Sequence, residues 1–177
     1  MMKFFYMSVL VLMAALTLTS CGSDDDKKDE PKPTSKNVSY EATVTFAQDM
    51  IDICDVTMVY KDGDGKTVTE AVKSTTWSKK VSVNKLPAVV GVKCNYKIKD
   101  GVQLTKDKYD IIAELHHDVI VDGTSKGFSK SPFYFIQSSG VRADKVAEMV
   151  SKRSGDVAYG YSITADVKVN ETKDISF

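Results

Sequence analysis

Apolar and polar residues alternate along most of the chain beyond residue 37. From Val38 to Phe46 every even position is apolar and every odd one is polar, the pattern of a strand with one buried face. In three further stretches the apolar residues also fall on alternate positions, namely Val92–Ile98, Tyr109–Val121 and Tyr159–Val169. We therefore predict four strands that each place one face in a core.

Shorter strands are predicted at Asp55–Tyr60, Thr67–Lys73, Thr76–Val83 and Pro132–Ile136. The segment Lys61–Lys66 reads Lys-Asp-Gly-Asp-Gly-Lys between the first two, and Asp-Gly between apolar runs is a strong hairpin signal. Most of the predicted strands therefore pair with neighbours in sequence.

One helix interrupts the strands near residues 141–153. Val146, Met149 and Val150 follow a helical spacing, Ser139 is a candidate N-cap, and Gly155 lies just past a basic end. We expect this narrow apolar stripe to pack on a sheet edge or over one open end of the sheets.

About eight strands joined by hairpin turns favour an all-β fold. We predict an antiparallel, immunoglobulin-like β-sandwich with one short helix, and a lipocalin-like barrel is the alternative. The hallmarks of a true immunoglobulin domain are missing, because the strand layout around Trp77 does not match it. The expected likeness is one of fold only, which does not imply function.

The first 20 residues carry a targeting pattern rather than a folded element. Lys3 precedes an apolar run over residues 4–17, which is the secretory signature and is too short for an ordinary membrane-spanning helix. The run ends in Leu-Thr-Ser-Cys-Gly at Leu18–Gly22, which resembles the lipobox of bacterial lipoproteins. The resemblance implies cleavage before Cys21 and acylation of its thiol, so that lipid holds the protein to a membrane.

Four residues behind this cysteine add a second resemblance. Ser23, Asp24, Asp25 and Asp26 are similar to the acidic export signal on surface lipoproteins of the Bacteroidetes phylum. The resemblance implies an outer-membrane lipoprotein whose soluble part faces the cell exterior. A solvated acidic linker is the alternative interpretation of such a run, but its position directly behind a lipobox favours the export signal.

The region between the anchor and the first strand lacks large apolar residues. Residues 21–36 are therefore interpreted as the lipidated cysteine followed by a flexible acidic spacer, and residues 37–177 as a single domain of common size. That domain holds nineteen basic and nineteen acidic residues. A neutral chain without a basic stripe argues against nucleic acid as a partner.

Cys54 and Cys94 are the cysteines that remain after lipidation. An even number in an exported domain permits one disulfide. Two buried free thiols are an equally good interpretation, because unpaired cysteine is commonly buried. The sequence leaves these alternatives open.

No catalytic or cofactor-binding constellation is recognisable. His116 and His117 are the only histidines, and neighbours on a strand point to opposite faces, so the two cannot chelate one ion together. His117 falls on the apolar face and is expected in the core, whereas His116 and Asp118 share the polar face. Two ligands at that spacing are too common to indicate a metal site, so we expect no metal, no cofactor and no enzyme activity.

Aromatic residues offer one candidate contact for a ligand. Trp77 aligns with apolar positions and is expected to be buried, whereas alternation sets Tyr134 on the opposite face from Phe133 and Phe135. Tyr134 is therefore the candidate for an exposed platform that contacts a ligand.

These features favour a non-catalytic binding or adhesion module at the cell surface, with a glycan or an envelope or host protein as its partner. A structural subunit of an outer-membrane assembly is the alternative. A small-ligand carrier, which needs an open apolar cavity, and a glycan-processing enzyme, which needs two close carboxylates, are less favoured.

Overall fold

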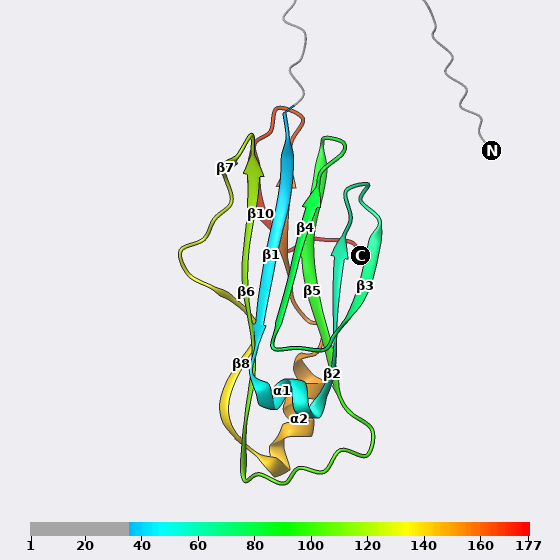
Figure 1. Ribbon diagram of the computed structural model, residues 1–177, viewed down its shortest axis with the longest axis vertical. Coiled ribbons are helices and arrows are strands. Elements are labelled where there is room, and N and C mark those ends of the chain that lie inside the picture. Colours follow the sequence, from blue (N-terminus) through cyan, green and yellow to red (C-terminus); the bar gives the residue numbers. More distant parts are fainter. Residues whose placement is uncertain (1–35) are drawn as a thin grey trace, which may run out of the picture. The chain divides into compact units, whose positions relative to one another are not determined.

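In a computed structural model, residues 36–177 form two antiparallel sheets that face each other (Figure 1). Contacts gather Ser35–Phe177 into one compact unit. The sheets do not close into a barrel, so the predicted β-sandwich is confirmed and the lipocalin-like alternative is wrong.

Each sheet contains five strands. In sheet A, β1 (Val38–Phe46) lies between β4 (Thr76–Ser82) and β6 (Lys108–Val121), and β6 also pairs with β7 (Thr124–Ser125) and β8 (Phe133–Arg142). Sheet B has the order β10 (Val169–Thr172), β9 (Ala158–Ile163), β5 (Ala88–Ile98), β2 (Cys54–Lys61) and β3 (Thr67–Val72). All the pairings are antiparallel.

The first five strands follow the immunoglobulin pattern. β1 pairs with β4 in one sheet, and β3, β2 and β5 are neighbours in the other, as strands B, E, C′, C and F are in that fold. The later strands depart from it, because β6, β8 and a helix come between β5 and its partner β9. The chain therefore shares a Greek-key start with that fold and completes its sheets differently.

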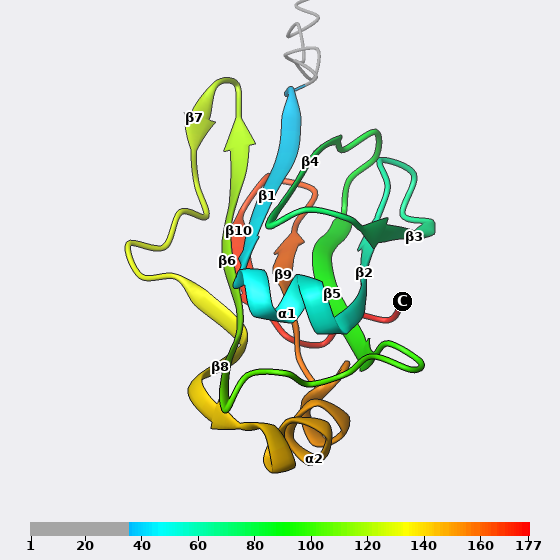
Figure 2. The same cartoon turned by 60° about the horizontal axis from the view of Figure 1, so that its bottom comes forward.

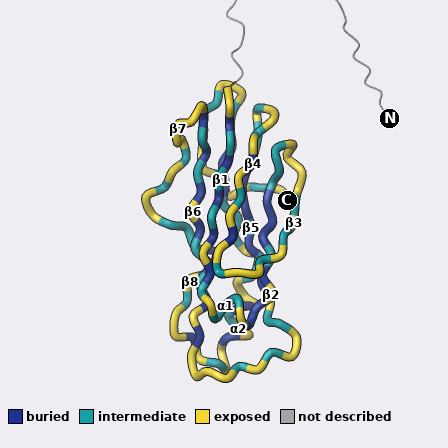
Figure 3. The backbone as a smooth tube through the Cα atoms, viewed as in Figure 1, coloured by how far each residue is buried: buried dark blue, intermediate teal, exposed yellow. Residues whose placement is uncertain are grey.

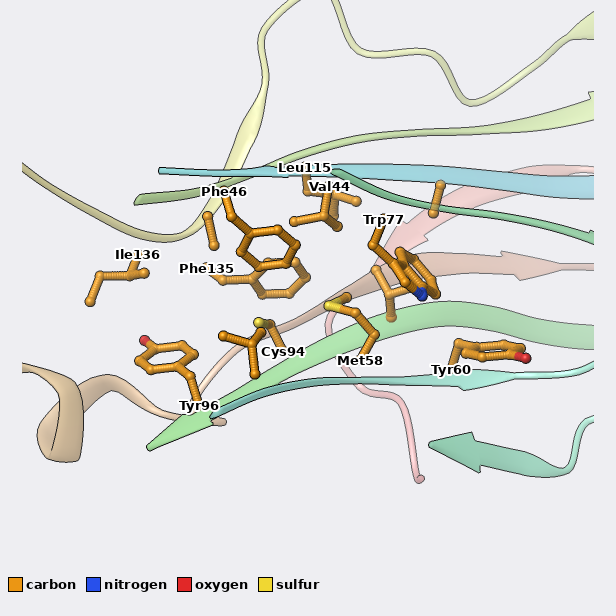
Figure 4. Close-up of a cluster of buried hydrophobic side chains, with 14 of the residues drawn as sticks. Val44, Phe46, Met58, Tyr60, Trp77, Cys94, Tyr96, Leu115, Phe135 and Ile136 are labelled. Atoms are coloured by element: carbon orange, nitrogen blue, oxygen red, sulfur yellow. The ribbon is translucent and has the colours of Figure 1, made fainter. Parts of the chain in front are cut away.

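The core forms as the alternation predicts. All five inward positions of β1 are buried, and so are the seven inward positions of β6 from Tyr109 to Val121. Figure 3 shows buried positions alternating with less buried ones along these strands. In Figure 4, Phe46 and Leu115 from sheet A point toward Met58 and Cys94 from sheet B, and this burial of apolar area stabilises the sandwich.

Two helices cover one end of the sandwich (Figure 2). The predicted helix is α2 (Ala143–Arg153), which buries Val146 and Val150, and Gly155 follows it with a φ of 73°. The expected cap at Ser139 is wrong, because that residue belongs to β8 and Arg142 occupies the cap position without a side-chain bond. β8 is longer than predicted and runs directly into the helix.

The second helix, α1 (Gln48–Ile53), was not predicted. It buries Met50 and Ile53 and packs against β2 and β6. Six residues give fewer than two turns, which is too short for a helical period to stand out from a strand pattern.

The long strand predicted over Tyr159–Val169 is wrong. It divides into β9 and β10 at a turn in which the Lys168 N–H donates to the Thr164 hydroxyl at 2.9 Å and the Val167 N–H donates to the Thr164 carbonyl at 2.9 Å. Val167 has a φ of 65°, which is rare for a β-branched residue. Residues 164–168 contain neither Gly nor Pro to mark this turn, and the apolar alternation continues across it by coincidence.

The last five residues cross the outer face of sheet B; we call residues 173–177 the C-terminal strap. Its Ile175 side chain lies directly over Gly91 and Gly160, which face each other across β5 and β9. A side chain on either glycine would collide with Ile175 and with backbone atoms. Figure 1 shows the strap (red) running from β10 toward β2 and β3, where Phe177 lies beside Lys61.

Candidate functional site

The outer face of sheet A carries a shallow depression of about 230 Å³ beside the loop that joins β7 to β8. Residues from β1, β6 and this loop line it: Glu41, Ala42, Thr43, His116, His117, Asp118 and Phe128. Most of these side chains are polar, and Phe128 is the aromatic exception. The depression therefore combines hydrogen-bonding groups with one exposed apolar ring.

Phe128 is 63% exposed, and Val89 is the other large hydrophobic residue that is exposed among residues 36–177. Burying such a ring would remove apolar area from water, yet no neighbour in the described part of the chain covers it. An exposed aromatic side chain beside a polar rim is what binding surfaces commonly present.

The backbone next to Phe128 is held in place from both sheets. The Gly127 N–H donates to Asp118 Oδ1 on β6 at 2.9 Å, and the Tyr161 hydroxyl on β9 donates to the Gly127 carbonyl. A Cβ on Gly127 would lie 2.8 Å from the Tyr161 ring, so the glycine permits this close approach. Phe128 is thus presented at a fixed place, which lowers the entropy cost of binding through it.

Further along the same face, a Glu–His pair borders the candidate Tyr134. His116 Nε2 lies 2.9 Å from Glu114 Oε1, and Tyr134 is the cross-strand partner of Glu114. Partial burial raises the pKa of Tyr134, and the nearby Glu114 carboxylate raises it further. The phenol is therefore protonated at neutral pH and is able to donate a hydrogen bond.

The predicted orientations of the side chains of residues 133–135 are only partly confirmed. Tyr134 is on the outer face as expected, but a register shift between Ala113 and Glu114 disturbs the alternation of β8. Phe135 and Ile136 are consequently both buried, while Phe133 is half-buried against His117 and Tyr159. The shift is a β-bulge or a similar irregularity, which re-aims side chains in this way.

His117 points the other way from His116, into the core. It is 6% exposed, its Nδ1 lies 3.0 Å from the Tyr40 hydroxyl, and its Nε2 has no hydrogen-bond partner. Rings of Phe133, Tyr159 and Tyr161 surround it. Burial lowers its pKa to about 4, so the imidazole is neutral at pH 7 and belongs to the packing of the interior.

Asp118 shares the polar face with His116 but is occupied with holding Gly127. Within residues 36–177, no three His, Cys, Asp or Glu side chains gather in a way that would hold a metal ion. Asp118 instead anchors the loop at Gly127, and His116 pairs with Glu114.

Trp77 is buried as expected, at the open side of the sandwich between β3 and β4. Its Nε1 donates to Glu70 Oε2 at 3.1 Å, and Glu70 Oε1 also accepts from the Tyr60 hydroxyl at 2.8 Å and from Lys79 Nζ at 2.5 Å. The hydrogen bond from Lys79, followed by those from Tyr60 and Trp77, lowers the pKa of Glu70 against the opposing effect of burial. The tryptophan joins two sheet edges and offers no platform for a ligand.

The two cysteines of the domain are both buried and free. They lie on adjacent strands, but Cys54 is opposite Ile98 and Cys94 is opposite Met58. An offset of four residues separates the cysteines by about 13 Å along the ladder, whereas a disulfide needs Cα atoms within about 7 Å. The structure therefore favours two free thiols, and burial raises the pKa of Cys54 to about 11.

Cys21, Ser23, Asp24, Asp25 and Asp26 lie outside the described residues, so lipidation and export stay predictions. Among the helices described for residues 36–177, neither is long and apolar enough to cross a membrane.

A scan against protein-family models, a search of curated proteins and a search of solved structures each found no match. The site therefore rests on its own geometry.

Alternation along the strands points to Tyr134 but not to Phe128, which lies in a loop. Phe128 stands alone in the polar segment Ser-Lys-Gly-Phe-Ser-Lys at residues 125–130. A lone aromatic residue in such a loop has no core face to occupy, and this was the signal that would have found it.

Proposed function

We propose that this protein is a lipid-anchored, non-catalytic binding module at the bacterial cell surface, and that it binds a glycan or a protein through the depression beside Phe128. The observation that carries the proposal is an exposed phenylalanine whose loop is fixed by Asp118 and Tyr161. An aromatic ring offers a flat apolar face, and the surrounding carboxylates, imidazole and hydroxyl supply acceptors and donors.

A glycan is the partner that this chemistry fits best. Thr43, His116 and Glu41 line the depression around Phe128, so polar groups surround an apolar ring. A sugar presents an apolar ring face together with a rim of hydroxyls, which suits such a mixture. The depression is shallow, which suits an exposed chain better than a small molecule that must be enclosed.

The proposed absence of catalysis is supported by the contacts of two carboxyl groups whose pKa values are lowered, Asp49 and Glu70. Asp49 is held by Lys106 Nζ at 2.5 Å and by the Asp110 N–H at 2.9 Å, which together lower its pKa. Glu70 is saturated by three donors. These groups tie elements of the fold together and are not free to exchange protons with a substrate.

The proposal is tested by screening the full chain in detergent against glycan arrays and then measuring affinity by titration. Phe128→Ala should lower affinity at least ~10-fold, in line with the loss of an interfacial aromatic anchor. Val89→Ala is the matched control, because Val89 is the other exposed hydrophobic residue and lies on sheet B. Equal affinities of the wild-type chain and Phe128→Ala would overturn the assignment of the site.

The cell-surface part of the proposal has its own test. Protease and antibody should reach residues 36–177 on intact cells, and replacing Asp24, Asp25 and Asp26 by Ala should abolish that access. A domain that stays protected until the outer membrane is broken would contradict surface display.

A further inference from the structure

The sandwich has exposed sheet edges, and three of them carry features that discourage pairing with another chain. β4 carries the exposed Lys80, β8 is interrupted by two register irregularities, and β10 is only four residues long. Charged residues, bulges and short strands are the usual protections of an edge.

β3 is the edge without these protections. Its six residues include four β-branched ones, contain no Lys or Pro, and keep an unbroken register with β2 from Val72 to Thr67. Its one charged residue, Glu70, is turned toward Tyr60, Trp77 and Lys79. This carboxylate is held by donors of its own chain, so it leaves the outer edge of β3 free.

The hairpin bond identifies which backbone groups of β3 are free. The Asp62 N–H donates to the Lys66 carbonyl at 2.9 Å, so residues 62 and 66 form a hydrogen-bonded pair. Such pairs alternate along an antiparallel ladder, and residues 68, 70 and 72 therefore also bond to β2. The N–H and C=O groups of Thr67, Thr69 and Ala71 point away from it, and within residues 36–177 no strand pairs on that side.

We propose that β3 is a self-association edge, at which two copies of this protein join their sheets by antiparallel pairing of β3 with β3 about a two-fold axis at Thr69. This register sets Thr69 opposite Thr69 and Thr67 opposite Ala71. Every one of these residues has free backbone groups, so each opposed pair exchanges two hydrogen bonds.

The side chains of β3 favour the register centred on Thr69 and are compatible with a second copy as the partner. Val68 faces Glu70, and no two like charges face each other. A shift that centres the axis on Glu70 opposes two carboxylates, which is unfavourable. A two-fold arrangement uses the same patch on both copies, as most dimers do.

The contact is small and is weak in dilute solution. One six-residue strand pair lies below the ~1,200 Å² typical of stable interfaces. Copies held on one membrane meet at a raised local concentration. The association therefore belongs to the anchored protein and is independent of the depression beside Phe128.

The test uses the full chain in lipid vesicles at a fixed surface density. Thr69→Cys sets two thiols opposite each other across the axis, at a separation that a disulfide can span. The control is Ser82→Cys, an exposed residue at the end of the protected edge β4. Mild oxidation should crosslink Thr69→Cys at least ~10-fold faster than Ser82→Cys.

Proline variants separate strand pairing from chance collision. Ala71→Pro in the Thr69→Cys background removes a free edge N–H and should reduce crosslinking to the Ser82→Cys rate, whereas Ala71→Thr should preserve it. Thr67→Pro repeats the test at the first residue of the strand, where proline is best tolerated. For each proline variant, an unchanged thermal unfolding midpoint shows that the protein is folded.

Crosslinking of Thr69→Cys no faster than Ser82→Cys, or crosslinking that both folded proline variants leave intact, would overturn the proposal. Phe128→Ala should leave the crosslinking rate unchanged, so failure of self-association is distinguishable from failure of ligand binding.

Discussion

The two outer faces of the sandwich differ in how they meet the solvent. On sheet B, Gly91 and Gly160 form a hollow that the chain fills with its own Ile175, and the outward-facing Val59 is only 8% exposed. On sheet A, the outward positions of β1 and most of those of β6 are polar or charged, with Ile112 and Ile120 as the apolar exceptions, and Phe128 beside them stays exposed.

The C-terminal strap fills the glycine hollow of sheet B, whereas no segment among residues 36–177 covers Phe128. Placing Ile175 in this hollow half-buries its side chain, which removes apolar area from water and so stabilises the fold. Leaving Phe128 uncovered forgoes that gain. A fixed but uncovered aromatic side chain is therefore the feature of sheet A on which the proposed binding site rests.

The largest predicted effect is on the covered face. In Gly160→Ala the new Cβ would lie 2.0 Å from the Val90 carbonyl oxygen and 2.7 Å from Ile175, so backbone or strap must move. We expect a loss of about 3–4 kcal/mol in the free energy of unfolding, measured by urea denaturation. A tolerated alanine would mean that Ile175 does not lie on this glycine pair.

A second prediction concerns His117, which is buried in the core behind the depression. The pKa of His117 is about 4 in the folded protein and about 6.5 when unfolded. The unfolded chain therefore takes up the proton first as pH falls, and stability decreases between pH 6.5 and 4, by roughly 2–3 kcal/mol.

Urea midpoints at pH 7, 5.5 and 4 measure this loss. His117→Gln keeps a polar side chain beside Tyr40 but cannot titrate, so its stability should fall less over the same interval. Parallel curves for the two proteins would show that the imidazole is accessible to protons when folded.

The strap supplies a third and smaller effect. Ile175→Ala removes a half-buried side chain from the glycine hollow, and we expect a loss of about 1–2 kcal/mol. The neighbouring Ser176→Ala should have almost no effect, because Ser176 is exposed. Equal stabilities of the two variants would mean that the strap does not contribute to the fold.

The smallest effects on stability are expected on the open face. Phe128→Ala and Tyr134→Ala should each change the free energy of unfolding by less than about 0.5 kcal/mol, while both lower affinity for a ligand. A marked drop in the melting temperature of Phe128→Ala would show that its ring supports the loop, which would weaken the contrast between the faces.

Local sequence patterns were enough to predict several elements. β1 begins and ends where the alternation does, and all seven inward positions of β6 are buried. The Asp-Gly hairpin forms with Gly65 at a φ of 80°, and Asp62 accepts hydrogen bonds from the N–H groups of Asp64 and Lys66. These elements are fixed by neighbouring residues, so the sequence expresses them directly.

Other features depend on contacts between distant segments. The break between β9 and β10 is an exception, because it is local, but its turn at Thr164–Lys168 contains neither Gly nor Pro to mark it. The shift in β8 changes which aromatic residues are buried. Tyr134 could be placed on the outer face by alternation, but Phe128 is held by Asp118 and by Tyr161 from the opposite sheet, which no local pattern reveals.

By itself the sequence determined an all-β chain with one principal helix near its end, a buried His117 beside an outward His116, and a signal-like start ending at Cys21. Those conclusions follow from periodicity, composition and short motifs, which are local properties. The tertiary structure alone decided that Cys54 and Cys94 are offset, that Ile175 closes sheet B, and that Phe128 stays open on sheet A. Each of these depends on strand register and on contacts between residues far apart in the chain. A register shift of one residue turns every side chain of a strand to the opposite face of the sheet.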